Sequence, residues 1–216
     1  MNPIFRDFFN DIKPIKMREQ LVGISGAFRT EDDVLEYSFA DTVKMAGHVC
    51  PTVSGAYVSC QKALEKLYPD EIPVRGDIAV TVYGAPDDGV YGVIGQVFSF
   101  VTGAAPNTGF KGLGTRFKRK DLLKFKDERI DPSAMCFEFR RLDNKKAVLV
   151  KFYSHKIPYP REKEARIGEL IQKVVWDGAT GAEKKEFQEL WTDKVKTIVL
   201  DNKDIDKWMK VESVIQ

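Results

Sequence analysis

The segment GHVCP, residues 47–51, places a histidine and a cysteine two residues apart, directly before a proline. The chain of 216 residues holds only two histidines and three cysteines, so the spacing of His48 and Cys50 is notable. A neutral imidazole and a thiolate are ligands that zinc and other borderline transition metals accept, and a thiolate also attacks electrophiles. The pair therefore predicts a metal-binding or catalytic site at His48 and Cys50. Two ligands do not close a zinc site, so the alternative is a loop histidine beside a buried thiol.

A helix over residues 51–67 is expected to position this pair. Proline favours the first helical position, so Pro51 predicts that Cys50 is the N-cap. There, unpaired backbone N–H groups and the positive end of the helix dipole favour the thiolate form. We expect Tyr57 to share the side of Cys50 and to contact a bound cofactor, whereas Cys60 falls among the packing residues as a small buried side chain. Two further polar residues are expected on the side of Cys50: Ser54 and Gln61.

The remaining pattern predicts the other elements of the fold. Apolar, β-branched and alternating runs predict strands, the last two forming a hairpin: residues 76–84, 134–142 and 146–154. Helical periodicity predicts helices, the first of them closed by a C-cap glycine: residues 90–101, 161–175 and 182–200. Because strands and helices do not alternate regularly, we expect an α+β fold with a small mixed β-sheet flanked by helices.

Two parts of the chain are expected to differ in organisation. Residues 1–160 are predicted to form the α+β core, preceded by a short N-terminal amphipathic helix, and residues 161–216 a helical C-terminal extension. The extension keeps an apolar stripe that needs a surface to cover it, either the core or a partner subunit. We therefore expect a homodimer.

A glycine-rich segment, residues 103–116, precedes a run of basic residues that continues to Lys126. Long ordered loops in compact domains are often functional, and exposed backbone N–H groups can hold an anion. We expect Lys111 and Arg116 to attract a small anionic ligand or a phosphate-bearing cofactor. The alternative is a solvated charged turn. The glycines do not follow the phosphate-loop or dinucleotide-binding patterns.

Composition limits the classes of function. The chain has 43% hydrophobic and 31% charged residues, as in ordinary globular proteins, and its formal net charge of +2 argues against a dedicated nucleic-acid binder. Residues 1–16 lack the features of a secretory signal, and no apolar run approaches the ~20 residues that span a bilayer. We therefore expect a cytoplasmic protein with reduced thiols and no membrane partner.

The stretch GHVCPTVSGAYVSCQKALEKLY, residues 47–68, resembles the GHxCPG signature helix of the FmdE family, which takes its name from formylmethanofuran dehydrogenase. The resemblance extends over roughly residues 35–155, through the strand at 76–84, the segment Ala85 to Asp88 and the glycine-rich loop. It implies a thioredoxin-like core. It also implies a metal, with zinc expected, held by His48 and Cys50.

The chain departs from the family at two places. Ala85 stands where the family has the cysteine of a Cys-x-x-Asp motif, and no cysteine follows Cys136, so the C-terminal zinc finger of many members is missing. A replacement ligand is expected from a partner subunit or from one of three residues of this chain: His155, Asp87 or Asp88. Cys136 is expected to be a packing residue.

The incomplete ligand set leaves two functions open. One is an FmdE-like metal-binding protein, with or without catalysis, that binds a small anionic ligand beside His48 and Cys50. The other is a non-catalytic accessory or cofactor-carrying protein that binds iron or haem through the same two residues. Open coordination positions favour the second function, because a weaker protein ligand set leaves room for an exchangeable group.

Overall fold

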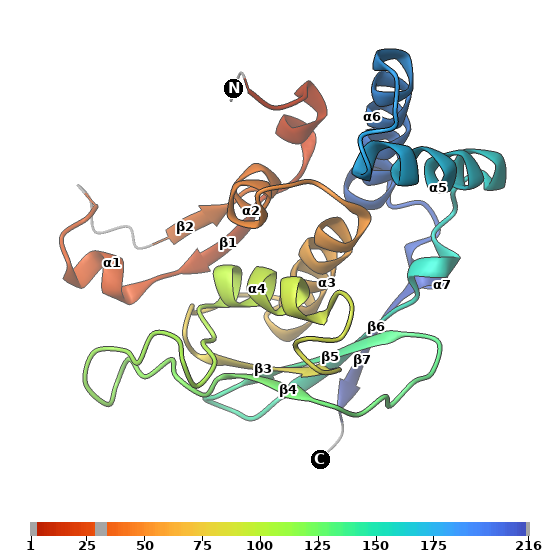
Figure 1. Cartoon of the computed structure of the whole chain (residues 1–216). Helices are drawn as coiled ribbons and strands as arrows, with labels where there is room; N and C mark the ends of the chain where they lie inside the picture. The colour runs from red at the N-terminus through yellow and green to blue at the C-terminus, as the bar shows by residue number, and fades with distance from the viewer. Residues whose placement is uncertain (1–3, 29–33, 215–216) are drawn as a thin grey trace.

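A five-stranded mixed sheet forms the base of the molecule (Figure 1). The computed structural model describes residues 4–28 and 34–214. The strand order is β4-β3-β5-β6-β7; β3 pairs with β4 in parallel, and the other neighbours are antiparallel. The predicted α+β class with a mixed sheet is confirmed. The strands have these bounds: β3 Ile78–Tyr83, β4 Leu123–Lys126, β5 Met135–Arg141, β6 Ala147–Phe152 and β7 Met209–Val214.

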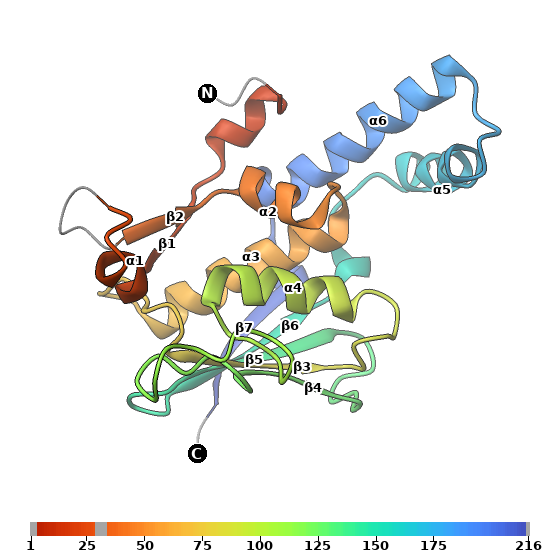
Figure 2. The same cartoon turned by 60° about the vertical axis from the view of Figure 1, so that its left-hand side comes forward.

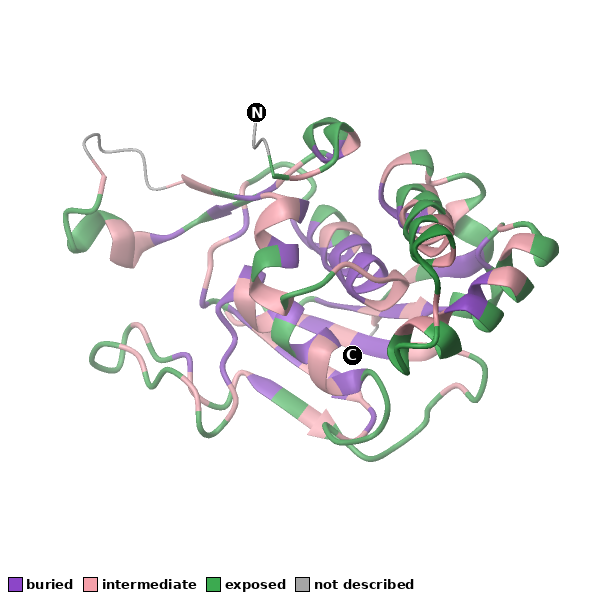
Figure 3. Cartoon of the chain, turned by 45° about the horizontal axis from the view of Figure 1, so that its top comes forward, coloured by how far each residue is buried: buried purple, intermediate pink, exposed green. Residues whose placement is uncertain are grey.

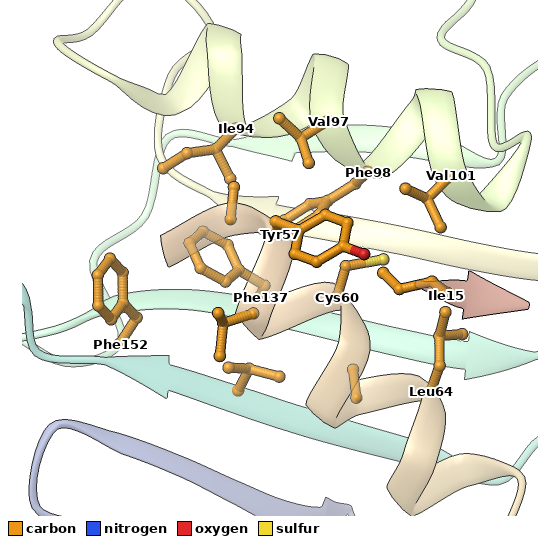
Figure 4. Close-up of a cluster of buried hydrophobic side chains, with 14 of the residues drawn as sticks. Ile15, Tyr57, Cys60, Leu64, Ile94, Val97, Phe98, Val101, Phe137 and Phe152 are labelled. Atoms are coloured by element: carbon orange, nitrogen blue, oxygen red, sulfur yellow. The ribbon is translucent and has the colours of Figure 1, made fainter. Parts of the chain in front are cut away.

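Two helices, α3 (Pro51–Leu67) and α4 (Tyr91–Thr102), cover one face of this sheet (Figures 1 and 2). Burial alternates along β3, where Ile78, Val80 and Val82 are buried and the residues between them are partly exposed. The buried residues of β3 and β5 and the facing side chains of α4 form the core, and Figure 4 shows Phe98 and Phe137 among them. The hydrophobic burial of this layer is the main stabilising term of the fold.

A second, smaller layer lies over the helices. It contains a two-stranded antiparallel sheet of β1 (Ile15–Arg18) and β2 (Val34–Tyr37), with α1 (Gln20–Ile24) and α2 (Phe39–Ala46). Met17 and Phe39 are fully buried and join this layer to the core. The predicted N-terminal helix is a short 3-10 turn, η1, at Asp7–Asp11.

The C-terminal residues form a helical arm and then return to the sheet. Helices α5 (Arg161–Val175) and α6 (Gly181–Lys196) pack against each other and project from the core (Figure 2), close to the predicted bounds. A π-helical turn, η3 (Thr197–Asp201), and α7 (Ile205–Trp208) follow. The expectation of a wholly helical extension is wrong, because β7 becomes the fifth strand of the sheet and Trp208 is buried against Phe152.

No helix within residues 4–28 and 34–214 is long and apolar enough to cross a membrane.

Candidate functional site

The turn between α2 and α3 carries His48 and Cys50. Helix α2 begins with a capping box between Ser38 and Asp41 and ends at Ala46. Gly47 follows with a φ of 72°, the left-handed conformation that glycine adopts at little cost and that closes many helices. The chain then runs through His48 and Val49 into α3. The left-handed conformation of Gly47 therefore sets the direction in which the segment with His48 and Cys50 leaves α2.

Cys50 is the N-cap of α3, as the sequence predicts. Its backbone is extended, and its Sγ accepts a hydrogen bond from the Val53 amide at 3.4 Å. Its carbonyl oxygen accepts from the Ser54 amide at 3.0 Å and from the Ser54 hydroxyl at 2.8 Å. The side chain is half-buried, so solvent still reaches it. The sulfur therefore lies at the positive end of α3 and accepts an N–H bond there.

His48 is exposed and is oriented by the backbone. Its Nδ1 lies 2.9 Å from the carbonyl oxygen of Ala46. Because a carbonyl can only accept, Nδ1 must carry the hydrogen, and in the neutral ring Nε2 then has the free lone pair. A backbone carbonyl on the other ring nitrogen is the usual arrangement of metal-binding histidines. Nε2 of His48 is therefore available to a metal or to a proton.

Trp191 of α6 connects the helical arm to this turn. Its indole Nε1 donates a hydrogen bond to the carbonyl oxygen of Val49 at 2.7 Å, and its ring lies 5.2 Å from that of Phe187. The sequence pattern assigned Trp191 only to an apolar stripe. The one available signal was its N–H group, which needs an acceptor when the ring is buried.

The two other cysteines are shielded. Cys60 and Cys136 have 0% and 1% of their surface exposed, so their prediction as packing residues is confirmed. Burial raises the pKa of Cys136 to about 11 and that of Cys60 further. All three cysteines are free thiols within the described residues. Of the three thiols, Cys50 is therefore the one that solvent or a metal can reach.

Tyr57 does not face the site, and this expectation is corrected. Its side chain is 0% exposed and lies in the core with Cys60 (Figure 4). Its hydroxyl is 2.9 Å from the carbonyl oxygen of Tyr37 and 3.1 Å from that of Lys13, and burial raises its pKa. Gln61 bonds to the same Lys13 carbonyl at 3.1 Å. These polar groups attach α3 to the overlying β1–β2 layer instead of lining a ligand site.

The residues proposed as a third ligand are not brought to the pair. His155 lies in a short 3-10 turn, η2 (Ser154–Lys156), exposed and 6.3 Å from the Tyr153 ring. Asp88 forms an exposed ion pair with Arg129 at 3.0 Å, and Asp87 is exposed. In the part of the chain that the structure describes, no three His, Cys, Asp or Glu side chains are grouped to hold a metal. The expectation that one of these residues completes the site within the chain is therefore not met.

Lys111 and Arg116 also lie elsewhere. The glycine-rich loop projects beneath α1, whereas the α2–α3 turn lies beside the arm of α5 and α6 (Figures 1 and 2). Arg116 donates to Gln20 Oε1 of α1 at 3.2 Å, and the exposed Lys111 follows Phe110 in the loop. The expectation that this basic loop attracts a ligand beside His48 and Cys50 is therefore not met, because the loop and the α2–α3 turn face different sides of the fold.

A cleft of about 560 Å³ lies over α4. Its polar side chains are Gln96 and Ser99 of α4, and Met45 reaches it from α2, three residues before His48. No charged side chain is among its lining residues, so it does not resemble the anion-binding mouth that was expected. The rest of the lining is apolar or glycine: Pro86, Gly92, Gly95, Phe100, Pro106, Leu123 and Phe125.

Gly95 sets how closely α4 approaches β4. A Cβ atom at this position would lie 2.5 Å from Cζ of Phe125, which is closer than real side chains pack. Glycine costs a helix interior about 1 kcal/mol relative to alanine, so its place here needs a packing reason. The close approach of α4 and Phe125 supplies that reason and forms the floor of the cleft.

No protein-family model matches the chain, and the search of curated proteins finds no match.

Proposed function

We propose that this chain is an FmdE-like metal-binding protein in which His48 and Cys50 hold a transition metal, with zinc expected. The observation that carries the proposal is the hydrogen bond between His48 Nδ1 and the Ala46 carbonyl oxygen, 2.9 Å long. It selects the tautomer whose Nε2 can bind a metal, two residues from a cysteine that caps a helix.

The donor set fits an open site and not a closed one. A structural zinc site has four protein ligands, whereas this turn offers an imidazole nitrogen and a thiolate sulfur. When bound, such a metal would supply Lewis-acid polarisation of a ligand in its open positions. His48 keeps a proton on Nδ1 toward Ala46, and Val53 donates to the sulfur of Cys50. A small-molecule ligand would enter from solvent or from the cleft that Met45 borders.

We also propose that β3 to β6 represent a thioredoxin-like core. The order β4-β3-β5-β6 supports this proposal, with α4 as the crossover between the parallel pair and an antiparallel hairpin after it. A parallel pair joined through a helix and continued by a hairpin is the arrangement expected of that core. The additional strand β7 and the small β1–β2 sheet would then be elaborations of this chain.

Metal analysis of the purified protein tests the proposal. We expect about one zinc or other transition-metal ion per chain, with His48→Ala and Cys50→Ser each losing it while retaining the wild-type circular dichroism. His155→Ala is the matched control, because this exposed histidine lies outside the α2–α3 turn, and it should keep the metal. A Soret absorption band lost in the same two variants would assign the residues to haem iron instead. Full metal content in both variants would refute the site.

A further inference from the structure

The loop between α4 and β4, residues 103–122, is a fixed projection from the fold (Figure 1). Arg119 is buried at its base and donates to Glu19 Oε1 at 2.6 Å, and Arg75 donates to Glu19 Oε2 at 3.0 Å. Ala105 donates to the Arg119 carbonyl oxygen at 3.1 Å, which closes the base of the loop. The buried ion pairs and backbone bonds hold the loop in place, so the side chains at its tip have defined positions.

Much of this loop is exposed (Figure 3), and it carries large apolar side chains at its surface. Phe110 and Leu113 are 49% and 58% exposed, and Ile24 of the neighbouring α1 is 64% exposed. The bond from Arg116 to Gln20 joins the loop to α1, so the three residues belong to one side of the molecule. Exposed aliphatic and aromatic side chains that gather on a projection mark an interaction surface.

The same projection is strongly basic. Residues 103–122 contain five basic residues and one acidic residue, the exposed Asp121, although the net charge of the whole chain is only +2. Lys111, Arg116 and Lys118 are exposed, and Lys120 is half-buried. The nearby carboxylate of Glu19 is buried and already paired with Arg119 and Arg75. The loop therefore presents a net positive charge around its exposed apolar side chains.

We propose that this surface docks the protein peripherally on an anionic lipid bilayer. The loop surface consists of Ile24, Phe110, Lys111, Leu113, Arg116 and Lys118. Apolar side chains on a projection enter the boundary between headgroups and acyl chains, while basic side chains around them contact anionic headgroups. No spanning helix is needed for such a contact. The prediction of no membrane partner depends on the length of apolar runs, which does not address a surface of this kind.

The aliphatic members of the surface favour lipid over nucleic acid. Single-stranded nucleic acids bind through aromatic rings on which bases stack, and Leu113 and Ile24 offer no such ring. The aromatic rings of the loop are engaged by cations of the chain, with Arg119 5.3 Å from the Phe110 ring and Arg116 4.9 Å from the Phe117 ring. Hydrocarbon is the environment that accepts leucine and isoleucine without a specific partner.

Docking through this surface would leave the α2–α3 turn open. The loop lies on the side of α1, whereas the α2–α3 turn lies beside the α5–α6 arm (Figures 1 and 2), where Trp191 bonds to Val49. The proposal is independent of the metal site, and its test needs no bound metal.

Co-sedimentation with vesicles tests the proposal. We expect binding to vesicles of phosphatidylcholine with phosphatidylserine, weaker binding at higher salt, and little binding to phosphatidylcholine alone. Lys111→Ala with Lys118→Ala should weaken binding about 30-fold, since each basic residue near an anionic membrane has an additive effect. Phe110→Ser with Leu113→Ser should weaken it to a similar extent. These side chains are exposed, so circular dichroism should not change.

Two matched pairs serve as controls. Val90→Ser with Ile130→Ser removes exposed apolar side chains elsewhere, and Lys184→Ala with Lys185→Ala removes exposed basic side chains from α6. Both should bind vesicles as the wild type does. Failure of the wild type to bind, or equal losses in the control pairs, would overturn the proposal. Binding of a single-stranded RNA by both the wild type and the Phe110→Ser, Leu113→Ser variant would also overturn it. A lower oligomer mass of that variant would do the same.

Discussion

The indole Nε1 of Trp191 lies 2.7 Å from the carbonyl oxygen of Val49, the residue between His48 and Cys50. Three bonds thereby fix this turn: His48 to Ala46, Trp191 to Val49 and Val53 to Cys50. The second comes from a helix that lies 142 positions away in the sequence. The C-terminal arm is therefore a structural support of the candidate site.

Trp191→Phe should loosen the turn without unfolding the protein. The phenyl ring keeps most of the packing but loses the hydrogen bond, which contributes about 1 kcal/mol. A turn that opens at about 1 kcal/mol lower cost is roughly fivefold more often open, so Cys50 should react with iodoacetamide about fivefold faster. Trp176→Phe at the tip of the arm is the control, because that ring is exposed at the end of α5. Identical Cys50 kinetics in the two variants would mean that the bond does not restrain the turn.

Cys50 should be the thiol that is alkylated first near neutral pH. Burial raises the pKa of Cys136 to about 11, and Cys60 is raised further, so both remain protonated and shielded. Cys50 is half-buried at a helix N-terminus. Peptide mapping after brief iodoacetamide treatment should find the label on Cys50, and added zinc should slow its labelling. Equal, slow labelling of all three cysteines would support the alternative of a merely buried thiol.

Local signals in the sequence predicted many elements correctly. The proline after Cys50 correctly predicted the start of α3, and Gly103, which has a φ of 74°, the end of α4. The alternating apolar and polar runs correctly predicted the β5–β6 hairpin. These features depend on a few neighbouring residues, so a single sequence contains them.

The position of Tyr57 could not be predicted from a helical wheel. Residues 53–60 are all buried, because α3 packs against the sheet, α2, α4 and the C-terminal segment at once. This part of α3 therefore has no solvent face, so its polar side chains turn inward to backbone acceptors. The sequence alone does not state how many neighbours a helix has.

Two edge strands were also missed for a physical reason. β4 (LKFK) and β7 (MKVESV) alternate apolar and charged residues, and they were assigned to a basic run and to a helical extension. Lysine on an edge strand prevents unwanted pairing with other chains, and the same lysine weakens the apolar signal by which strands are recognised. Their pairing partners lie far away in the sequence, as the long connection to β7 shows.

Gly95→Ala should destabilise the protein, because the new Cβ would lie 2.5 Å from Phe125 Cζ. Overpacking of this kind costs about 1–3 kcal/mol, which exceeds the gain in helix propensity. Gly168→Ala in α5 is the matched control, since nothing lies within 4 Å of its Cβ, and it should stabilise by up to about 1 kcal/mol. Urea unfolding of both variants measures the difference. A stabilising effect of both substitutions would show that Phe125 moves away freely.

A homodimer remains a prediction, but the apolar stripe of the arm no longer supplies the surface for it. The apolar stripe of the arm is covered within the chain, where Ile167, Leu170 and Val195 are buried. The exposed apolar side chains of the arm are Val175 and Trp176 at its tip, with Trp176 79% exposed. We expect light scattering at micromolar concentration to give a dimer, and Val175→Ser with Trp176→Ser to give a monomer. A monomeric wild type would remove this prediction.

Acid should destabilise the fold through Glu19. Burial alone would raise the pKa of this carboxyl group, but hydrogen bonds from Arg75, the Leu21 amide and Arg119 outweigh it and hold the pKa below the ordinary value of 4.5. A lowered pKa means that the stabilisation is complete above the ordinary value and is lost as the pH falls through the lower value in the folded state. The free energy of unfolding should therefore decline below about pH 4.5, the range in which the unfolded carboxyl takes up its proton.

Glu19→Gln isolates this contribution. It keeps the shape of the side chain but leaves Arg119 and Arg75 without their buried anion, which should cost about 3–5 kcal/mol at pH 7 and flatten the acid decline. Glu65→Gln is the control, since Glu65 forms an exposed pair with Lys62 at 2.9 Å and its loss should cost no more than about 1 kcal/mol. Urea unfolding at a series of pH values compares the three proteins. If Glu19→Gln and Glu65→Gln lose equal stability at pH 7, the buried ion pairs do not hold the base of the loop.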